Sequence, residues 1–268
     1  MAVTAEQRDL IDTIHRVLAA DDGIEAVWLA GSLGQGKGDA FSDVDVLVLT
    51  VDGRLGDTMA RYARDVSMIA EPVLVNPLYG GRVLSVVAAD WRRFDLTFVE
   101  GGDLGRYNSA ALSCLFNKAG RAPPERGPIP YKTQPEELLK LVNEFLRVLG
   151  LLVGGIGREE FVLGLQGVGL LRQMTLDLML EENGVGPAER GGALHRNPLL
   201  TPDQRHELEA LAPVPADRAG IITANVALAE LFLPRARQLA GRIGMTWPEA
   251  FEAATRRHLR VGLDLTFR

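Results

Sequence analysis

The amino-acid sequence predicts an α+β fold, with a mixed sheet flanked by helices in the first half of the chain and a helical bundle in the second. Short apolar runs between glycine-rich turns are confined to the first half, which is typical of strands. After Thr133, apolar residues recur at helical spacing. Residues 122–130 contain four prolines and one glycine and read as a linker. We therefore expect two domains, residues 1–128 and 129–268.

Composition and charge narrow the class of protein. Of the 268 residues, 47% are hydrophobic and 24% charged, as in soluble globular proteins with a sizeable core. The net charge of −6 argues against a general nucleic-acid binder and is compatible with an acidic pocket for a cationic small molecule. No signal peptide and no apolar run approaching a membrane span is visible, so we expect a cytoplasmic protein without a membrane partner. The single cysteine, Cys114, excludes an intramolecular disulfide and is expected to be a small buried hydrophobe.

The elements of the first half follow from periodicity and turn residues. Residues 4–20 carry apolar side chains at helical spacing, with Thr4 as N-cap and Asp21-Asp22-Gly23 as the stop. Further along, the pattern predicts strands at 26–30 and 43–49, a helix at 57–68, an edge segment at 71–76, strands at 83–89 and 93–99, and a helix at 109–118.

The second half is predicted to be helical throughout. Helical stripes of apolar residues cover 134–153, 158–182, 202–211, 218–243 and 248–259. Pro234 lies inside the fourth of these segments, so a bend or break is expected there.

The strand at 43–49 carries the clearest chemistry. Side chains of a strand alternate between its faces, so Asp43 and Asp45 point to the same side. Two carboxylates on one face of an apolar strand repel each other and are costly to desolvate, so they need a compensating cation. Hard oxygen ligands favour Mg²⁺, and a pair of such ions serves phosphoryl or nucleotidyl transfer. An isolated D-x-D tripeptide can also merely blunt a sheet edge.

A second feature precedes this pair. Gly31-Ser32 ends the preceding apolar strand, and such a pair brings backbone N–H groups and a hydroxyl close to an anion such as a phosphate. The loop at 33–42 contains three glycines and Lys37, which suits a flexible cradle better than a helix. The candidate nucleotide-binding residues are therefore Gly31, Ser32, Lys37 and Ser42.

Together these features resemble a known family. Gly31-Ser32, ten further residues and Asp43-Val44-Asp45-Val46 are similar to the signature of the DNA polymerase beta-type nucleotidyltransferase superfamily. Within it, GSLGQGKGDAFSDVDVLVL resembles the bacterial lincosamide and aminoglycoside (antibiotic) nucleotidyltransferases. The resemblance implies that Gly31 and Ser32 hold a nucleoside triphosphate and that Asp43 and Asp45 bind two Mg²⁺ ions.

The resemblance also implies a third carboxylate on a later strand. Asp95 lies within residues 93–99, between Phe94 and Leu96, where an acid without a partner would be expensive. We assign it as the third metal ligand or as the general base toward the acceptor hydroxyl. Asp90 is the competing residue, although its position is that of a turn.

Residues of the helical half are expected on the acceptor side, because the resemblance implies a second domain that closes the acceptor pocket. In relatives of this kind a glutamate of the second domain serves as general base, and Glu144 is the candidate here. Arg172 is expected either to meet the triphosphate or to be an ordinary surface residue. His195-Arg196 lies in a loop that either covers the nucleotide or is plain surface.

The activity that the resemblance implies is Mg²⁺-dependent transfer of a nucleoside monophosphate, AMP from ATP, to a hydroxyl of a small molecule. An aminoglycoside or lincosamide is the implied acceptor, which would make the protein an antibiotic-resistance enzyme. Two alternatives stay open: a nucleotide-binding regulatory or inactive relative of the same fold, and an enzyme that adenylylates a protein. A homodimer is compatible with the resemblance.

Overall fold

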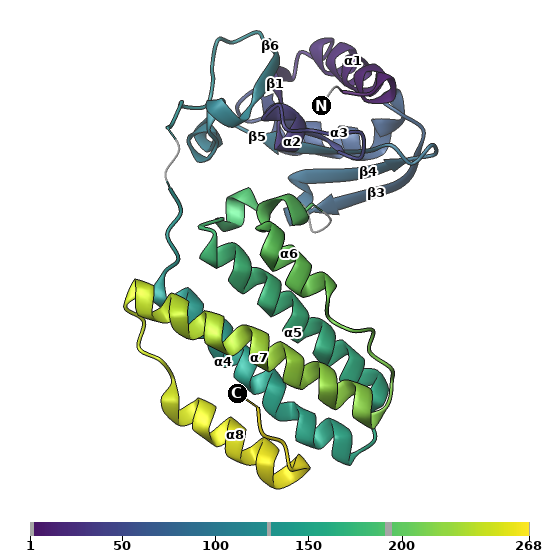
Figure 1. Cartoon of the computed structure of the whole chain (residues 1–268). Helices are drawn as coiled ribbons and strands as arrows, with labels where there is room; N and C mark the ends of the chain where they lie inside the picture. The colour runs from purple at the N-terminus through teal and green to yellow at the C-terminus, as the bar shows by residue number, and fades with distance from the viewer. Residues whose placement is uncertain (1–2, 128–129, 191–194, 268) are drawn as a thin grey trace. The chain divides into compact units, whose positions relative to one another are not determined.

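The computed structural model describes residues 3–127, 130–190 and 195–267. It divides into two compact units, Met1–Pro128 and Ile129–Arg268. The first unit contains the sheet and the second is built of helices, which confirms the predicted α+β fold class (Figure 1). Residues 128 and 129, between which the domain boundary is predicted, lie outside the described residues.

A six-stranded mixed sheet forms the first unit. Its strand order is β3-β4-β5-β2-β1-β6. The strands are β1 (Ile24–Leu29), β2 (Val44–Thr50), β3 (Pro72–Leu78), β4 (Val83–Ala88), β5 (Arg93–Val99) and β6 (Ser113–Asn117). Only the pair β2 and β5 is parallel among these neighbours; the other pairs are antiparallel. The two strands that carry the predicted acids are therefore direct neighbours at the centre of the sheet.

Helices cover one face of this sheet. Helix α1 (Ala5–Ala19) begins at Thr4, whose side chain forms a capping box with Gln7, and helix α3 (Leu55–Asp65) is extended by a 3₁₀ turn at Val66–Met68. Even-numbered residues of β2 and β5 point toward these helices and are fully buried. Because side chains alternate along a strand, the odd-numbered residues face the other side. Asp45 and Asp95 are among these odd-numbered residues.

The second face of the sheet is covered at one end. A small apolar cluster joins Trp28, Leu47, Leu49 and Val99 to Leu104, which lies in the 3₁₀ helix Gly101–Arg106. Toward the beginning of β2 and β5 the same face carries carboxylates in place of apolar side chains. This face therefore changes from apolar core to polar site along the length of two strands.

The prediction of a helix at 109–118 is wrong. Residues Ser109–Ala111 form a single 3₁₀ turn, and Ser113–Asn117 form β6, which pairs antiparallel with β1. The free edge of β1 supplies backbone hydrogen-bonding partners to β6, and this long-range pairing outweighs the local helical pattern. Because β6 lies at the sheet edge, Cys114 is exposed, in contrast to the predicted burial.

The second unit is a helical bundle, as predicted. It contains α4 (Pro135–Gly157), α5 (Phe161–Glu182), α6 (Pro202–Glu209), α7 (Arg218–Ile243) and α8 (Glu249–Leu263). Apolar side chains of α4, α5, α7 and α8 form one core, in which the rings of Phe145 and Phe232 stack with centroids 3.8 Å apart. In Figure 1, α4, α5 and α7 run side by side. The amphipathic stripes of the sequence are therefore the faces that meet in this core.

Helix α7 does not break at Pro234, although a break is one of the two predicted outcomes. The helix continues through this residue, and buried side chains lie on both sides of it, at Leu233 and Ala236. Packing of these flanking residues compensates for the backbone hydrogen bond that proline cannot donate. By length and composition, α7 is also the one helix among the described residues that is apolar enough to cross a membrane. Core helices pass the same test, and α7 contributes to the core of the bundle.

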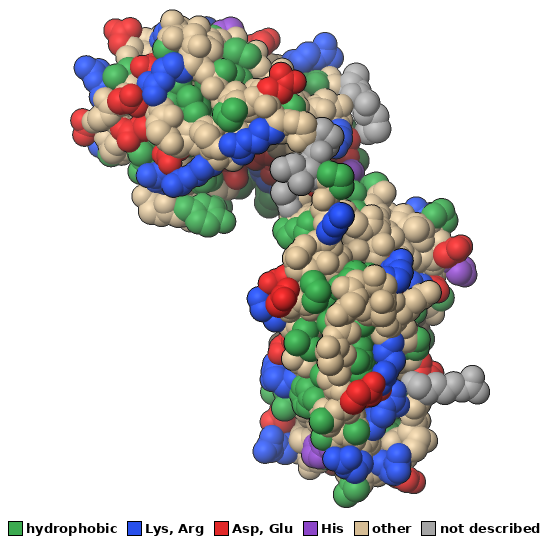
Figure 2. Space-filling view, turned by 90° about the vertical axis from the view of Figure 1, so that its left-hand side faces the viewer, with side chains coloured by type: hydrophobic (Ala, Val, Ile, Leu, Met, Phe, Trp, Pro, Cys, Tyr) green, Lys and Arg blue, Asp and Glu red, His purple; other side chains and the backbone are tan. Residues whose placement is uncertain are grey.

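Charges on the helical unit are mixed. Figure 2 shows acidic and basic side chains interspersed over the visible face of this unit. Several form short-range pairs along one helix, such as Lys140 with Glu137. Pairs of this kind contribute little to stability.

Candidate functional site

Three aspartates come together on the polar part of the sheet face. Asp45 of β2 lies directly opposite Asp95 of β5 in the parallel register. Asp43 immediately precedes β2, which begins at Val44, and its charge acts on both other carboxylates. Sequence periodicity predicts a shared face for the first two acids, and strand pairing brings the third beside them.

Burial and repulsion by neighbouring acids make the charged forms of Asp45 and Asp95 unfavourable, which is seen in their pKa values. Burial, then the charges of Asp43 and Asp95, raise the pKa of Asp45 to about 6. Burial also raises the pKa of Asp95, as does Asp43, while a hydrogen bond from Ser85 and the charge of Arg93 act in the opposite direction. Arg93 is thus a cation that partly compensates Asp45 and Asp95. The cluster is left with excess negative charge in a partly desolvated place.

This arrangement suits a divalent cation by its chemistry. Carboxylate oxygens are the ligands that Mg²⁺ prefers, and a bound cation would remove the repulsion that raises the pKa of Asp45. Within the described residues, no group of three or more His, Cys, Asp or Glu side chains is already arranged as a metal centre. The chemical type of these donors suits Mg²⁺, whereas their arrangement in this structure is not that of a formed metal centre.

Gly31 allows the backbone to approach this cluster. Residues Gly31–Gly34 form one helical turn, α2, in place of the open turn predicted from the sequence. The Ala30 amide donates to the carbonyl of Asp45 at 2.8 Å, which joins the end of β1 to β2. Gly31 has a φ of +57°, and a Cβ built on it would collide with Oδ2 of Asp45. Only glycine therefore fits beside this carboxylate.

The other predicted nucleotide-binding residues lie around the same loop. Ser32 is half-buried in α2, and its carbonyl accepts a hydrogen bond from the amide of Lys37, whose side chain is exposed. Ser42 is engaged within the loop, because its Oγ accepts from the Asp39 amide at 3.0 Å. Ser42 therefore shapes the loop in this structure, and the assignment of Ser32 and Lys37 to phosphate binding stays a prediction.

Two residues of the site region are absent from the sequence prediction. Gln7 of α1 is buried, and its side-chain amide donates to the carbonyls of Asp39 and Ser42 at 2.8 and 2.9 Å, which holds the loop against the helix. Arg93 shares the face of Asp95 and donates to the carbonyl of Phe41 at 3.3 Å. The period-two spacing from Asp95 could have placed Arg93 on the face of the acids. No local sequence pattern predicts that Gln7 contacts the loop.

Asp90 has the turn position that its sequence context indicates. Its Oδ2 accepts from Nε of Arg92 at 2.7 Å, and its Oδ1 accepts from the Arg92 amide at 3.1 Å. These hydrogen bonds lower the pKa of Asp90, and its side chain is about half exposed. An ion-paired turn residue is a poor competitor for the role assigned to Asp95.

Within the helical unit, the candidate acceptor-side residues lie on helix surfaces. Glu144 of α4 pairs with Arg147 through contacts of 2.6 and 2.7 Å, and hydrogen bonds from this arginine lower the pKa of Glu144. Arg172 is exposed on α5. Both residues are open to solvent in this unit, and their assignment to the acceptor side stays a prediction.

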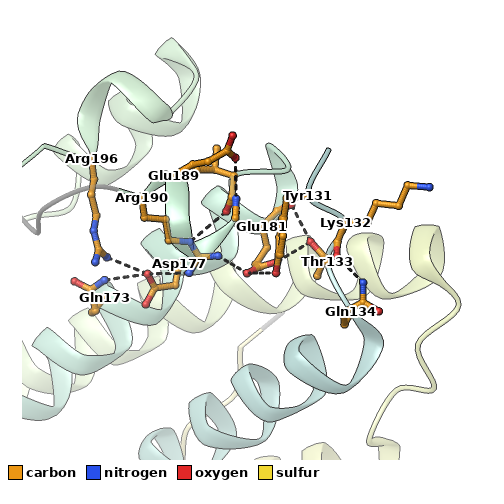
Figure 3. Close-up of polar contacts among 12 residues, drawn as sticks. Tyr131, Lys132, Thr133, Gln134, Gln173, Asp177, Glu181, Glu189, Arg190 and Arg196 are labelled. Carbon is orange, nitrogen blue, oxygen red and sulfur yellow. Dashed lines mark hydrogen bonds and ion pairs between the residues drawn. The ribbon is translucent and has the colours of Figure 1, made fainter. Parts of the chain in front are cut away.

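Arg196 belongs to a polar network beside the end of α5 (Figure 3). It contacts Asp177 at 3.1 Å, while Arg190 pairs with Glu181. Glu181 also accepts from the hydroxyl of Thr133 at 2.6 Å, in the segment that leads into α4. The network ties three segments of the helical unit together, so Arg196 has a structural role in it. His195 is exposed and keeps its predicted loop position.

Two cavities of the first unit are not lined by the three acids. A groove of about 1280 Å³ runs between the end of α1 and α3, on the helix-covered side of the sheet. A smaller cavity of about 180 Å³ is lined by Thr97 and Tyr107, among other residues.

Comparisons with known proteins give matches at the level of structure. No family model matches the sequence, and no curated protein gives a significant match. An aminoglycoside 6-adenyltransferase from Bacillus subtilis aligns over 96% of this chain and 98% of its own, with 14% identity and a TM-score of 0.43. A nucleotidyltransferase-like protein from Exiguobacterium sibiricum 255-15 covers 95% of this chain and 87% of its own, with 15% identity and a TM-score of 0.30. At these identities and TM-scores the likeness carries no residue role over to this chain.

Proposed function

We propose that this protein is a Mg²⁺-dependent nucleotidyltransferase that moves a nucleoside monophosphate, AMP from ATP, onto a hydroxyl of a small molecule and releases pyrophosphate. The observation that carries the proposal is the in-register pair Asp45 and Asp95, with Asp43 beside it, on one face of the sheet. Three carboxylates that repel one another cost folding stability, and clusters with such raised pKa values are typical of functional sites. An aminoglycoside or lincosamide is the acceptor class we would test first.

Each residue of the site has a proposed role. Asp43 and Asp45 would hold two Mg²⁺ ions, and Asp95 either completes their ligand set or accepts the proton of the acceptor hydroxyl. Bound Mg²⁺ supplies positive charge that stabilises the attacking and leaving oxygens of the transfer. Gly31 and Ser32 would hold the triphosphate beside these acids, and the Lys37 side chain would add a positive charge.

The direct test is pyrophosphate release. Purified protein is incubated with each of the four ribonucleoside triphosphates and Mg²⁺, with and without a panel of aminoglycosides and lincosamides. We expect acceptor-dependent release that stops when EDTA removes the metal, and mass spectrometry should find a nucleotidylated antibiotic. Nucleotide binding without release would favour a regulatory or inactive relative, and a labelled protein in lysate would favour protein adenylylation. Either result would contradict the proposed acceptor.

Gly31→Ala tests the close approach of the backbone to Asp45. We expect a loss of about 1–2 kcal/mol of stability from the left-handed backbone, together with a large loss of transfer activity because the new Cβ displaces the carboxylate. Gly36→Ala is the matched control, since Gly36 has a φ of +69° and a Cβ added there would meet no other atom within 4 Å. Thermal unfolding and pyrophosphate release are measured for both variants. Equal activity in the two would contradict this role of Gly31.

A further inference from the structure

Ser85 is the polar residue of β4 that faces the acid cluster. Burial alternates along β4, so that Val83, Ser85 and Val87 share the face on which Asp45 and Asp95 lie. The antiparallel register places Ser85 directly opposite Asp95. The Ser85 hydroxyl therefore lies between two valines and beside a partly buried carboxylate of the next strand. In this position it can interact with that carboxylate.

Cross-strand neighbours on one face lie close enough for their side chains to interact. Ser85 would be the donor of a hydrogen bond to Asp95, because an ionised carboxylate can only accept. Burial raises the pKa of Asp95, and Ser85 acts in the opposite direction. For Asp45, burial and the two neighbouring carboxylates are opposed by Arg93. The charge of Arg93 therefore acts on both facing acids, and Asp95 has the neutral Ser85 hydroxyl as an additional neighbour.

The position of Ser85 in the sheet makes this support rigid. Strand β4 is an interior strand, paired with β3 on one side and β5 on the other. A serine side chain has a single heavy-atom torsion, so its hydroxyl has few alternative positions. Groups that orient a ligand or a base work best from such rigid elements.

We infer that Ser85 is a positioning residue for Asp95: its hydroxyl holds one carboxylate oxygen and leaves the other directed to the cation or to the acceptor hydroxyl. The inference rests on the proposed function. It holds for both roles left open for Asp95, because a metal ligand and a general base each need one oriented oxygen.

The test compares Ser85→Ala, Ser85→Thr and the control Ser113→Ala. Ser113 is also a strand serine, but it opposes Leu29 and no acid. Mn²⁺ binding is measured by electron paramagnetic resonance on the full chain without nucleotide, together with kcat, KM and Tm. We expect Ser85→Ala to weaken Mn²⁺ binding or lower kcat by about 10- to 100-fold at unchanged Tm. Ser85→Thr, which keeps the hydroxyl, should stay within a few-fold of wild type, as should Ser113→Ala.

The outcomes separate this inference from the proposed function. Wild-type protein that neither binds Mn²⁺ nor releases pyrophosphate contradicts the proposed function, and the inference with it. An active wild type with Mn²⁺ affinity and kcat unchanged in Ser85→Ala overturns the inference alone. A loss in Ser85→Ala that Ser85→Thr does not restore also overturns it, because the hydroxyl would then not be the group that acts.

Discussion

Asp45→Asn is expected to abolish nucleotidyl transfer, with a loss of about 10²- to 10³-fold or more, while the first unit stays folded. Asparagine keeps the size of the side chain and removes the charge that would bind Mg²⁺. The change also removes a charge that is disfavoured by burial and by Asp43 and Asp95. The Tm of the variant should therefore equal or exceed that of the wild type, as expected where a site is kept for function at the expense of stability. Thermal unfolding and pyrophosphate release measure the two effects.

Two further variants make this result specific. Asp43→Asn should lose activity in the same way, because Asp43 belongs to the same cluster. Asp90→Asn is the control: Asp90 lies in the same unit, in an exposed turn, and bonds to Arg92. We expect its activity to match the wild type. Normal turnover by Asp43→Asn or Asp45→Asn would contradict the assignment of these residues as Mg²⁺ ligands. Loss of activity in Asp90→Asn would indicate that Asp90 belongs to the site.

Glu252→Gln is expected to destabilise the helical unit by about 2–3 kcal/mol. The Glu252 side chain is 5% exposed and accepts hydrogen bonds from Arg237, Arg256 and the indole of Trp247, at 2.6, 2.8 and 2.7 Å. A neutral amide has one acceptor oxygen in place of two, so it cannot satisfy the donors on both sides, and its N–H groups would face one set of them. The network joins α7 and α8 through the segment that connects them. Thermal unfolding followed by circular dichroism measures the loss.

The exposed neighbour Glu249 provides the matched control. It bonds to the same Arg237, at 2.8 and 2.9 Å, but its side chain is 68% exposed. Glu249→Gln should therefore cost much less stability than Glu252→Gln, as is usual for surface ion pairs. An equal loss in the two variants would show that burial of Glu252 does not decide the effect.

The contribution of Glu252 should also depend on pH. Hydrogen bonds from Arg256, Trp247 and Arg237 outweigh burial and hold its pKa below the ordinary value. A carboxyl with a lowered folded-state pKa stabilises the protein above its unfolded-state pKa, and this stability is lost as pH falls through the folded-state value. The difference in Tm between wild type and Glu252→Gln should thus be largest near neutral pH and shrink in acid. A difference that grows in acid would contradict the assignment.

The sequence by itself determined the face of each strand and the helices of the second unit. Period-two spacing places Asp45 on the face opposite to Val44 and Val46, and Asp95 on the face opposite to Phe94 and Leu96, and this holds in the structure. Helix α7 begins and ends where its apolar stripe predicts, at Arg218 and Ile243. These are local properties, since each depends on the spacing of side chains along one segment.

Only the tertiary structure decided which strands are neighbours. The parallel register of β2 and β5 brings Asp95 to Asp45, and the register of β4 brings Ser85 to Asp95. The same cause turned a predicted helix into β6, because β1 offered an unpaired edge. Gln7, far from the loop in sequence, holds it through two backbone carbonyls. Pairing and register depend on contacts between distant segments, so no local pattern contains them.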